Sequence, residues 1–162
     1  MKLVIKNNNI FRGTSTITDE TGREVFKMKG RLKWFSPTKK KYLLDLNGNT
    51  IYTIRNIWGT VMFHGAIIKD NDGNKLKMKS KLSIKSAWTV KNENDEYAIG
   101  RSKEHSGWDL RRNEEVIANI RRQGLGIVID TYLVDVYDET YADLIVAFVI
   151  ALDNIRDKNR ED

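Results

Sequence analysis

The segment 104–109 carries the side-chain types of a hydrolase triad. Glu104, His105, Ser106 and Asp109 are close neighbours in the chain. In such a triad a histidine accepts the serine proton and a carboxylate orients the imidazole. Neighbours on one loop rarely point at a common centre, and the other histidine, His64, lies in an apolar strand pattern. We therefore predict no catalytic residues and no enzyme activity, with a hydrolase kept as the weakest alternative.

Motifs for metals and dinucleotides are incomplete. Residues 70–74 imitate the start of an EF-hand loop, but Gly73 comes two places early and Lys81 stands where the bidentate glutamate belongs. A hairpin turn accounts for this stretch. Residues 124–126 (Gly-Leu-Gly) lack the third glycine and the following helix of a dinucleotide loop. We predict neither a metal nor a cofactor.

Two basic ladders are the most suggestive pattern for binding. Alternate residues of a strand share a face, so each ladder predicts an outward row of four cations with apolar partners turned inward. The rows are Lys27, Lys29, Arg31 and Lys33, and Lys75, Lys77, Lys79 and Lys81, with Lys39, Lys40, Lys41, Lys69 and Lys85 near them in sequence. Adjacent rows would form a cationic field for anionic head groups. The alternative is that these lysines serve solubility and block edge pairing.

The charge distribution favours anionic partners. The chain has a net charge of +6, but residues from 130 onward carry −6 and the rest carry +12. Such a surface attracts an anionic membrane surface, acidic protein or nucleic acid. Single-strand binders interleave aromatic rings with their cations, whereas here Phe26 and Trp34 fall on the opposite face. We therefore rank nucleic acid below lipid.

Turn signals divide the chain into hairpins. Asn47-Gly48 and Asp72-Gly73 are strong hairpin turns, and Thr21-Gly22 joins an earlier pair. The pattern predicts twelve strands: Leu3–Lys6, Thr14–Asp19, Arg23–Arg31, Tyr42–Leu46, Thr50–Arg55, Val61–Asp70, Lys75–Lys81, Ser86–Lys91, Glu96–Arg101, Trp108–Arg111, Val116–Arg121 and Ile127–Val136.

A helix of about 139–156 follows the last strand. Its centre is an uninterrupted apolar run, which predicts burial on all sides: Leu144, Ile145, Val146, Ala147, Phe148, Val149, Ile150, Ala151 and Leu152. Asp138, Glu139 and Thr140 suit its start, and Thr140 with Asp143 approximates a capping box. The run is too short to span a bilayer. Because a barrel of about eleven or more strands can hold a central helix, we predict a mainly β fold, a closed antiparallel barrel of about 12 strands around this helix.

The composition suits one domain over 1–162. The chain has no cysteine, which excludes disulfides and thiol catalysis and fits a reducing compartment. The N-terminal residues show neither a signal peptide nor a myristoylation motif. We expect a cytoplasmic monomer without a transmembrane span.

Four segments resemble the LURP-one-related family, in particular its small single-domain bacterial members of the YxjI type. They are TDETGREVFKMKGRLKWF (18–35), LLDLNGNTIYTI (43–54), IKDNDGNKLKMK (68–79) and YADLIVAFVIALDNI (141–155). Through that family the chain is similar to the tubby C-terminal domain and the phospholipid scramblases. The resemblance implies a tubby C-terminal-like barrel of twelve strands with the hydrophobic helix through its centre, in agreement with the strand pattern.

The resemblance also implies interaction with membrane lipid, since tubby domains bind phosphoinositide head groups and scramblases respond to calcium. The tubby lipid-binding pattern has no clear match here. The acidic segment of scramblases is echoed by Asp130, Asp135, Asp138 and Glu139, although helix capping explains at least two of these. We expect a binding domain with peripheral association with anionic phospholipid, a structural or protein-interaction domain being the alternative.

Overall fold

A computed structural model describes residues 1–8, 13–31, 40–57, 65–80, 88–124 and 129–161. Its strands are β1 (Lys2–Asn8), β2 (Gly13–Asp19), β3 (Glu24–Arg31), β4 (Lys40–Leu44), β5 (Thr50–Ile57), β6 (Gly65–Asp70), β7 (Lys75–Ser80), β8 (Trp88–Lys91), β9 (Glu96–Arg101), β10 (Trp108–Arg112), β11 (Glu115–Gly124) and β12 (Ile129–Val136). A 3-10 turn, η1 (Glu139–Tyr141), leads into the helix α1 (Ala142–Glu161).

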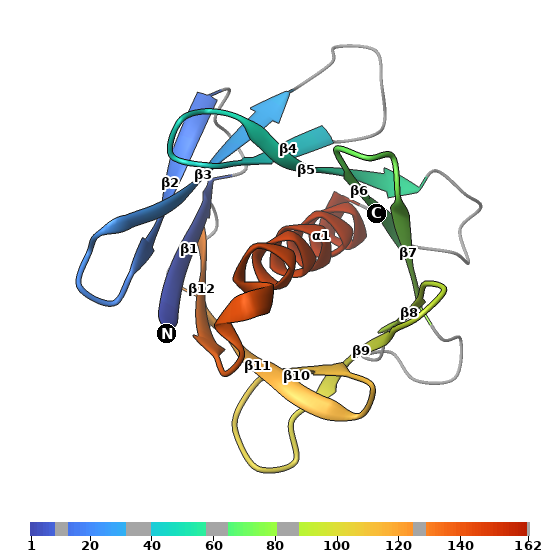
Figure 1. Ribbon diagram of the computed structural model, residues 1–162. Coiled ribbons are helices and arrows are strands. Elements are labelled where there is room, and N and C mark those ends of the chain that lie inside the picture. The colour runs from blue at the N-terminus through green and yellow to red at the C-terminus, as the bar shows by residue number, and fades with distance from the viewer. Residues whose placement is uncertain (9–12, 32–39, 58–64, 81–87, 125–128, 162) are drawn as a thin grey trace.

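The twelve strands form a closed antiparallel barrel (Figure 1). Each strand pairs with its neighbours in sequence, and β1 closes the ring on β12 with Leu3 opposite Val134. Closure leaves no free sheet edge to pair with another chain. The predicted fold class is confirmed.

Three hairpin turns use one local device. Gly22, Gly48 and Gly73 adopt φ values of 86°, 88° and 89°, which a residue with a Cβ adopts only with strain. In the second of these turns, the Asp45 carboxylate accepts a bond of 2.8 Å from the backbone N–H of Asn49. Hydrogen bonds from the backbone and the side chain of Asn49 hold the pKa of Asp45 below its usual range, and the backbone bond is the largest cause. Turn chemistry visible in the sequence thus sets the register of the hairpins.

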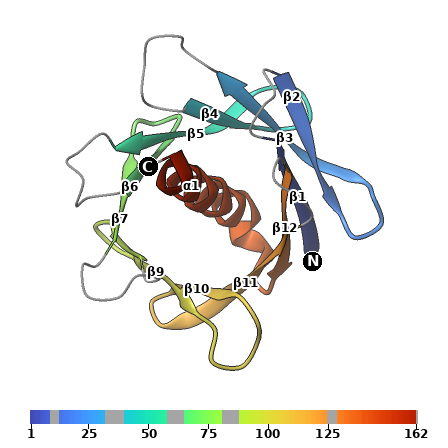
Figure 2. The ribbon, with the colours of Figure 1, turned by 180° about the vertical axis from the view of Figure 1, so that it is seen from behind.

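Helix α1 lies inside the barrel (Figures 1 and 2). All nine residues of the apolar run from Leu144 to Leu152 are buried, and Phe148 is 0% exposed. The helix packs most extensively on β5 and β6. It ends later than the sequence indicates, at Glu161 rather than near residue 156.

The start of the helix differs from the predicted capping box. Asp138, not Thr140, is the capping residue, and its carboxylate accepts a bond of 3.1 Å from the backbone N–H of Thr140. Asp143 instead accepts from the adjacent N–H of Leu144 at 2.7 Å. A 3-10 turn precedes α1, so the first free N–H groups belong to that turn and the cap moves upstream.

A polar network holds the later part of α1 within the barrel. Asp153, which is 1% exposed, accepts a bond of 2.7 Å from the Tyr132 hydroxyl and lies 3.6 Å from the ammonium of Lys41. Asn56 donates from its side-chain amide to the backbone carbonyl of Asn154 at 3.2 Å. These contacts tie the helix to β4, β5 and β12.

The filled barrel generates a stability prediction for Phe148. Phe148→Ala should lower the free energy of unfolding by about 3–5 kcal/mol, because it leaves a cavity where the helix packs on the wall. Urea unfolding measures this loss. Tyr137→Ala is the control, since Tyr137 is 53% exposed and its replacement should cost less than about 1 kcal/mol. Equal effects of the two substitutions would contradict a helix that fills the barrel.

The buried ion pair generates a second stability prediction. Lys41→Met should lower the free energy of unfolding by about 3–5 kcal/mol, because the Asp153 carboxylate stays buried without the Lys41 ammonium. The double variant Lys41→Met/Asp153→Asn should recover much of the loss, since it removes the unpaired charge while the amide oxygen still accepts from the Tyr132 hydroxyl. Thermal and urea unfolding of both variants would test this. Additive destabilisation in the double variant would show that the pair is not coupled.

Candidate anion-binding surface

The structure places the two basic ladders on β3 and β7. Lys29, Lys75, Lys77 and Lys79 are exposed, whereas Lys27 is half-buried. Their chain neighbours Met28 and Met78 are buried on the opposite face, inside the barrel. Arg31 ends β3, while Lys33 and Lys81 lie outside the described residues.

The two ladders are not adjacent. Strands β4, β5 and β6 separate β3 from β7. Four steps of about 4.8 Å place the two rows roughly 19 Å apart along the wall. Any joint cationic field therefore depends on what the three intervening strands carry.

The register shows that those strands carry cations too. Across the sheet, Lys29 pairs with Tyr42, Tyr42 with Thr53, Thr53 with Lys69, and Lys69 with Lys75.

The neighbouring row has the same character. Its register runs from Arg31 through Lys40, Arg55 and Ile67 to Lys77, and by strand alternation the last four share the face of the first row. We call the exposed and half-exposed cations of the two rows the cationic band: Lys29, Lys40, Arg55, Lys69, Lys75 and Lys77. The band belongs to five strands, β3 to β7, which are consecutive in the barrel wall (Figure 1).

The middle of the band is hollowed. A concavity of about 180 Å³ is lined by Lys40, Thr53, Arg55, Ile67, Lys69 and Lys75. Four of its six lining residues are cations and none is an acid. The guanidinium of Arg55 can bind a phosphate through two parallel N–H bonds, and lysine ammonium groups add point charges. The Thr53 hydroxyl supplies a further donor.

The electrostatics of the band favour an external anion. Lys40 lies directly opposite Arg55, and Lys69 directly opposite Lys75, and like charges in such cross-strand pairs are destabilising. Within the described residues, no ion pair joins a cation of the band to a carboxylate. The Lys40 ammonium lies 5.5 Å from the centre of the Tyr42 ring. A bound anion would relieve the repulsion between these cations.

The sequence interpretation missed the two polar residues Thr53 and Arg55 of the hollow and misplaced Lys41, which does not belong to it. Arg55 and Thr53 were not singled out, although the hairpin signal at Asn47-Gly48 places their strand beside the strand of Lys40. The register shifts between Leu43 and Leu44, so the turn alone does not give the pairing of Arg55 with Lys40. Lys41 was grouped with the surface cations. The structure turns its side chain inward to Asp153, so Lys41 is 9% exposed and contributes nothing to the band.

Comparison with known proteins agrees with this architecture. The profile of the LURP-one-related family matches residues 1–153. The chain belongs to the LURP-one-related family. No curated protein and no solved structure matches it. In this LURP-one-related chain, no described helix is both long enough and apolar enough to cross a membrane.

Two of the triad-like residues of this LURP-one-related chain, His105 and Asp109, make contacts other than those of a triad. His105 is exposed, and its backbone N–H donates to the Ser102 hydroxyl at 3.0 Å. Asp109 is buried and accepts a bond of 2.9 Å from the Asn119 amide. The carboxylate of Asp109 is therefore engaged on the barrel wall, and His64 lies outside the described residues.

The acids before the helix make structural contacts. Asp135 pairs with Arg121 at 2.9 Å, and Glu139 pairs with the N-terminal amine at 3.3 Å. Asp138 is the cap described above, and Asp130 lies in β12. Across the ranges that the structure describes, no group of three or more His, Cys, Asp or Glu residues could hold a metal ion.

The band generates a prediction for free anions. Tripolyphosphate should raise the melting temperature by about 2–4 °C, which corresponds to roughly 1 kcal/mol for a chain of this size. Arg55→Gln/Lys69→Gln should reduce this rise to less than half. The matched control Arg101→Gln/Lys103→Gln removes the same charges from exposed positions in β9 and the loop after it. Equal rises in both variants would contradict a localised site.

Proposed function

We propose that this protein is a non-enzymatic binding domain that associates peripherally with anionic phospholipid or phosphoinositide head groups. The single observation that carries the proposal is the hollow in the cationic band, where Lys40, Arg55, Lys69 and Lys75 meet without an acidic neighbour in the lining. Phosphate oxygens are the hydrogen-bond acceptors that such a set of charged donors binds best.

The size of the band supports a surface ligand. Cations extend over five strands, so several can approach a charged bilayer together. Each lysine or arginine close to an anionic membrane contributes about 1 kcal/mol. The barrel interior along α1 is packed with apolar side chains, which directs an anionic ligand to the outer wall. Tubby domains, to which the family is similar, also use surface lysine and arginine for head groups.

Liposome cosedimentation tests this proposal. Binding should be negligible to neutral phosphatidylcholine vesicles and measurable on vesicles with phosphatidylserine or phosphatidylinositol bisphosphate, and it should weaken as salt rises. Arg55→Glu/Lys69→Glu should lower the partition coefficient at least about 30-fold, since two contributions of about 1 kcal/mol are lost and replaced by repulsion.

The matched control has the same change in net charge. Arg101→Glu/Lys103→Glu should keep most of the binding, because these exposed side chains belong to β9 and the loop after it. Melting temperatures of both variants verify that the barrel is intact. Absence of binding to anionic vesicles at low salt would refute the proposal. Binding only to an acidic protein from the host would favour the protein-interaction alternative.

A further inference from the structure

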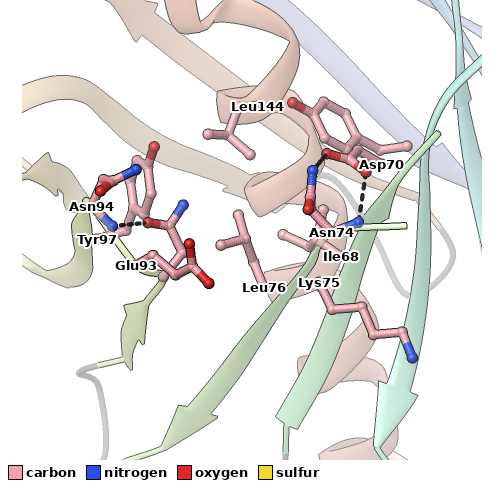
Figure 3. Close-up of a pocket in the computed structure, with 11 residues that line it drawn as sticks. Ile68, Asp70, Asn74, Lys75, Leu76, Glu93, Asn94, Tyr97 and Leu144 are labelled. Carbon is pink, nitrogen blue, oxygen red and sulfur yellow. Dashed lines mark hydrogen bonds between the residues drawn. The ribbon is translucent and has the colours of Figure 1, made fainter. Parts of the chain in front are cut away.

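A second and larger cavity opens at the end of the barrel where α1 begins. It has a volume of about 550 Å³, within the range of roughly 300–1,000 Å³ that is usual for small-molecule sites. The β6–β7 and β8–β9 turns and the first turn of the helix surround it (Figure 3). We call it the mouth cavity; its lining residues are Tyr52, Ile68, Asp70, Asn74, Lys75, Leu76, Asn92, Glu93, Asn94, Tyr97 and Leu144.

The inner part of the mouth cavity is apolar and well packed. Ile68 from β6 and Leu144 from α1 are 1% and 7% exposed, and Leu76 from β7 packs against the core. Tyr97 is 3% exposed, and its ring centre lies 5.3 Å from that of Phe148. These contacts provide a fixed apolar surface for the body of a ligand.

The rim is polar and held in place by the turns. Both oxygens of Asp70 accept bonds of 2.8 Å from Asn74, and Asn92 accepts from the backbone N–H of Asn94 at 2.9 Å (Figure 3). Carboxylate oxygens have further acceptor sites beyond these bonds. The rim is therefore a preorganised set of acceptors.

Two of the three charged residues that line the mouth cavity are acidic. Asp70 and Glu93 stand on its two sides, whereas the Lys75 side chain extends away from its centre, towards the outer wall (Figure 3). The same Lys75 lines the cationic hollow. Lys75 therefore lies between the cationic hollow on the outer wall and the acidic residues of the mouth cavity.

Two tyrosines that line the mouth cavity, Tyr52 and Tyr97, have raised pKa values. Burial raises the pKa of Tyr52 to about 12, and the charges of Asp143 and Asp70 add to the rise. Burial also raises the pKa of Tyr97, where Asp95 acts in the same direction and Arg112 opposes it. Arg112 is paired with Asp95 at 2.8 Å, so these two charges largely offset each other. Two carboxylates, those of Asp143 and Asp70, therefore lie close enough to Tyr52 to act on its hydroxyl, although the chain has a net charge of +6.

We infer that the mouth cavity binds a small organic ammonium ion that carries an apolar body. The ammonium group would donate to the carboxylates of Asp70 and Glu93, and the body would lie on Ile68, Leu76 and Leu144. Tyr52, which is half-buried, also lines the cavity, and a tyrosine ring can attract a cation. This inference does not depend on the lipid proposal, since the two sites share only Lys75.

Two-dimensional NMR titration of the full chain with 2-phenylethylammonium tests the inference. Shift changes should cluster on residues lining the mouth cavity. The neutral 2-phenylethanol should bind at least about tenfold more weakly, and phenylacetate should not bind there, because each lacks the charge that the carboxylates recognise. Non-specific attraction to a chain of net charge +6 would favour the anion, so a preference for the cation must arise locally.

Variants separate the mouth cavity from the cationic band. Glu93→Gln should weaken binding of the ammonium ion about three- to tenfold, as expected for loss of one exposed charge partner. Glu115→Gln is the matched control, because Glu115 is an exposed glutamate at the start of β11. This control should leave binding of the ammonium ion unchanged. Leu76→Phe should also weaken binding by filling the cavity, whereas Arg55→Glu/Lys69→Glu should keep it.

If Leu76→Phe does not fold, Glu93→Gln still tests the inference. Three results would overturn the inference. The first is no saturable shift at roughly 10 mM 2-phenylethylammonium, beyond the weak end of specific binding. The second is equal affinity for the alcohol and the ammonium ion. The third is a cluster of shifts on the cationic band instead of the mouth cavity.

Discussion

The filling of the barrel by α1 is the constraint on which the rest of the structure depends. A ring of twelve strands is too wide for its own side chains to fill, and the helix supplies the missing apolar volume. Phe148 and its neighbours occupy the axis, so the interior holds no large ligand along the packed part of the helix. Binding chemistry is left to the outer wall and to the mouth, where α1 has only begun.

Strand geometry then distributes the charges. Side chains alternate between core and solvent, so a strand rich in lysine presents its cations outward when apolar residues occupy the other positions. The same alternation turns the Lys41 side chain inward, on the core face of β4 with Leu43, and Asp153 of the helix gives it a buried partner. The ion pair between them costs desolvation, and its geometry links β4 to one position of α1. Such a pair specifies how the helix sits in the barrel more than it adds net stability.

Local signals explain why most of the fold could be predicted. The turns at Gly22, Gly48 and Gly73 require positive φ, and alternating residues on both sides define strands, so each hairpin is encoded within about fifteen residues. The observed strand ends differ from the predicted ones by a few residues, because hydrogen-bonded pairing extends past the alternating pattern, as in β11, which continues to Gly124. The helix cap was misassigned because a 3-10 turn precedes α1.

The sequence by itself determined the strands, their hairpin turns, the apolar helix and the outward parity of the basic ladders, since each depends on residues close together in the chain. The tertiary structure decided which strands pair in the sheet, so that the ladders lie three strands apart with Arg55 and Lys69 between them. It also decided that Asp153 of the helix is the buried partner of Lys41. That contact depends on the position of the helix in the barrel, which brings together side chains more than about a hundred residues apart.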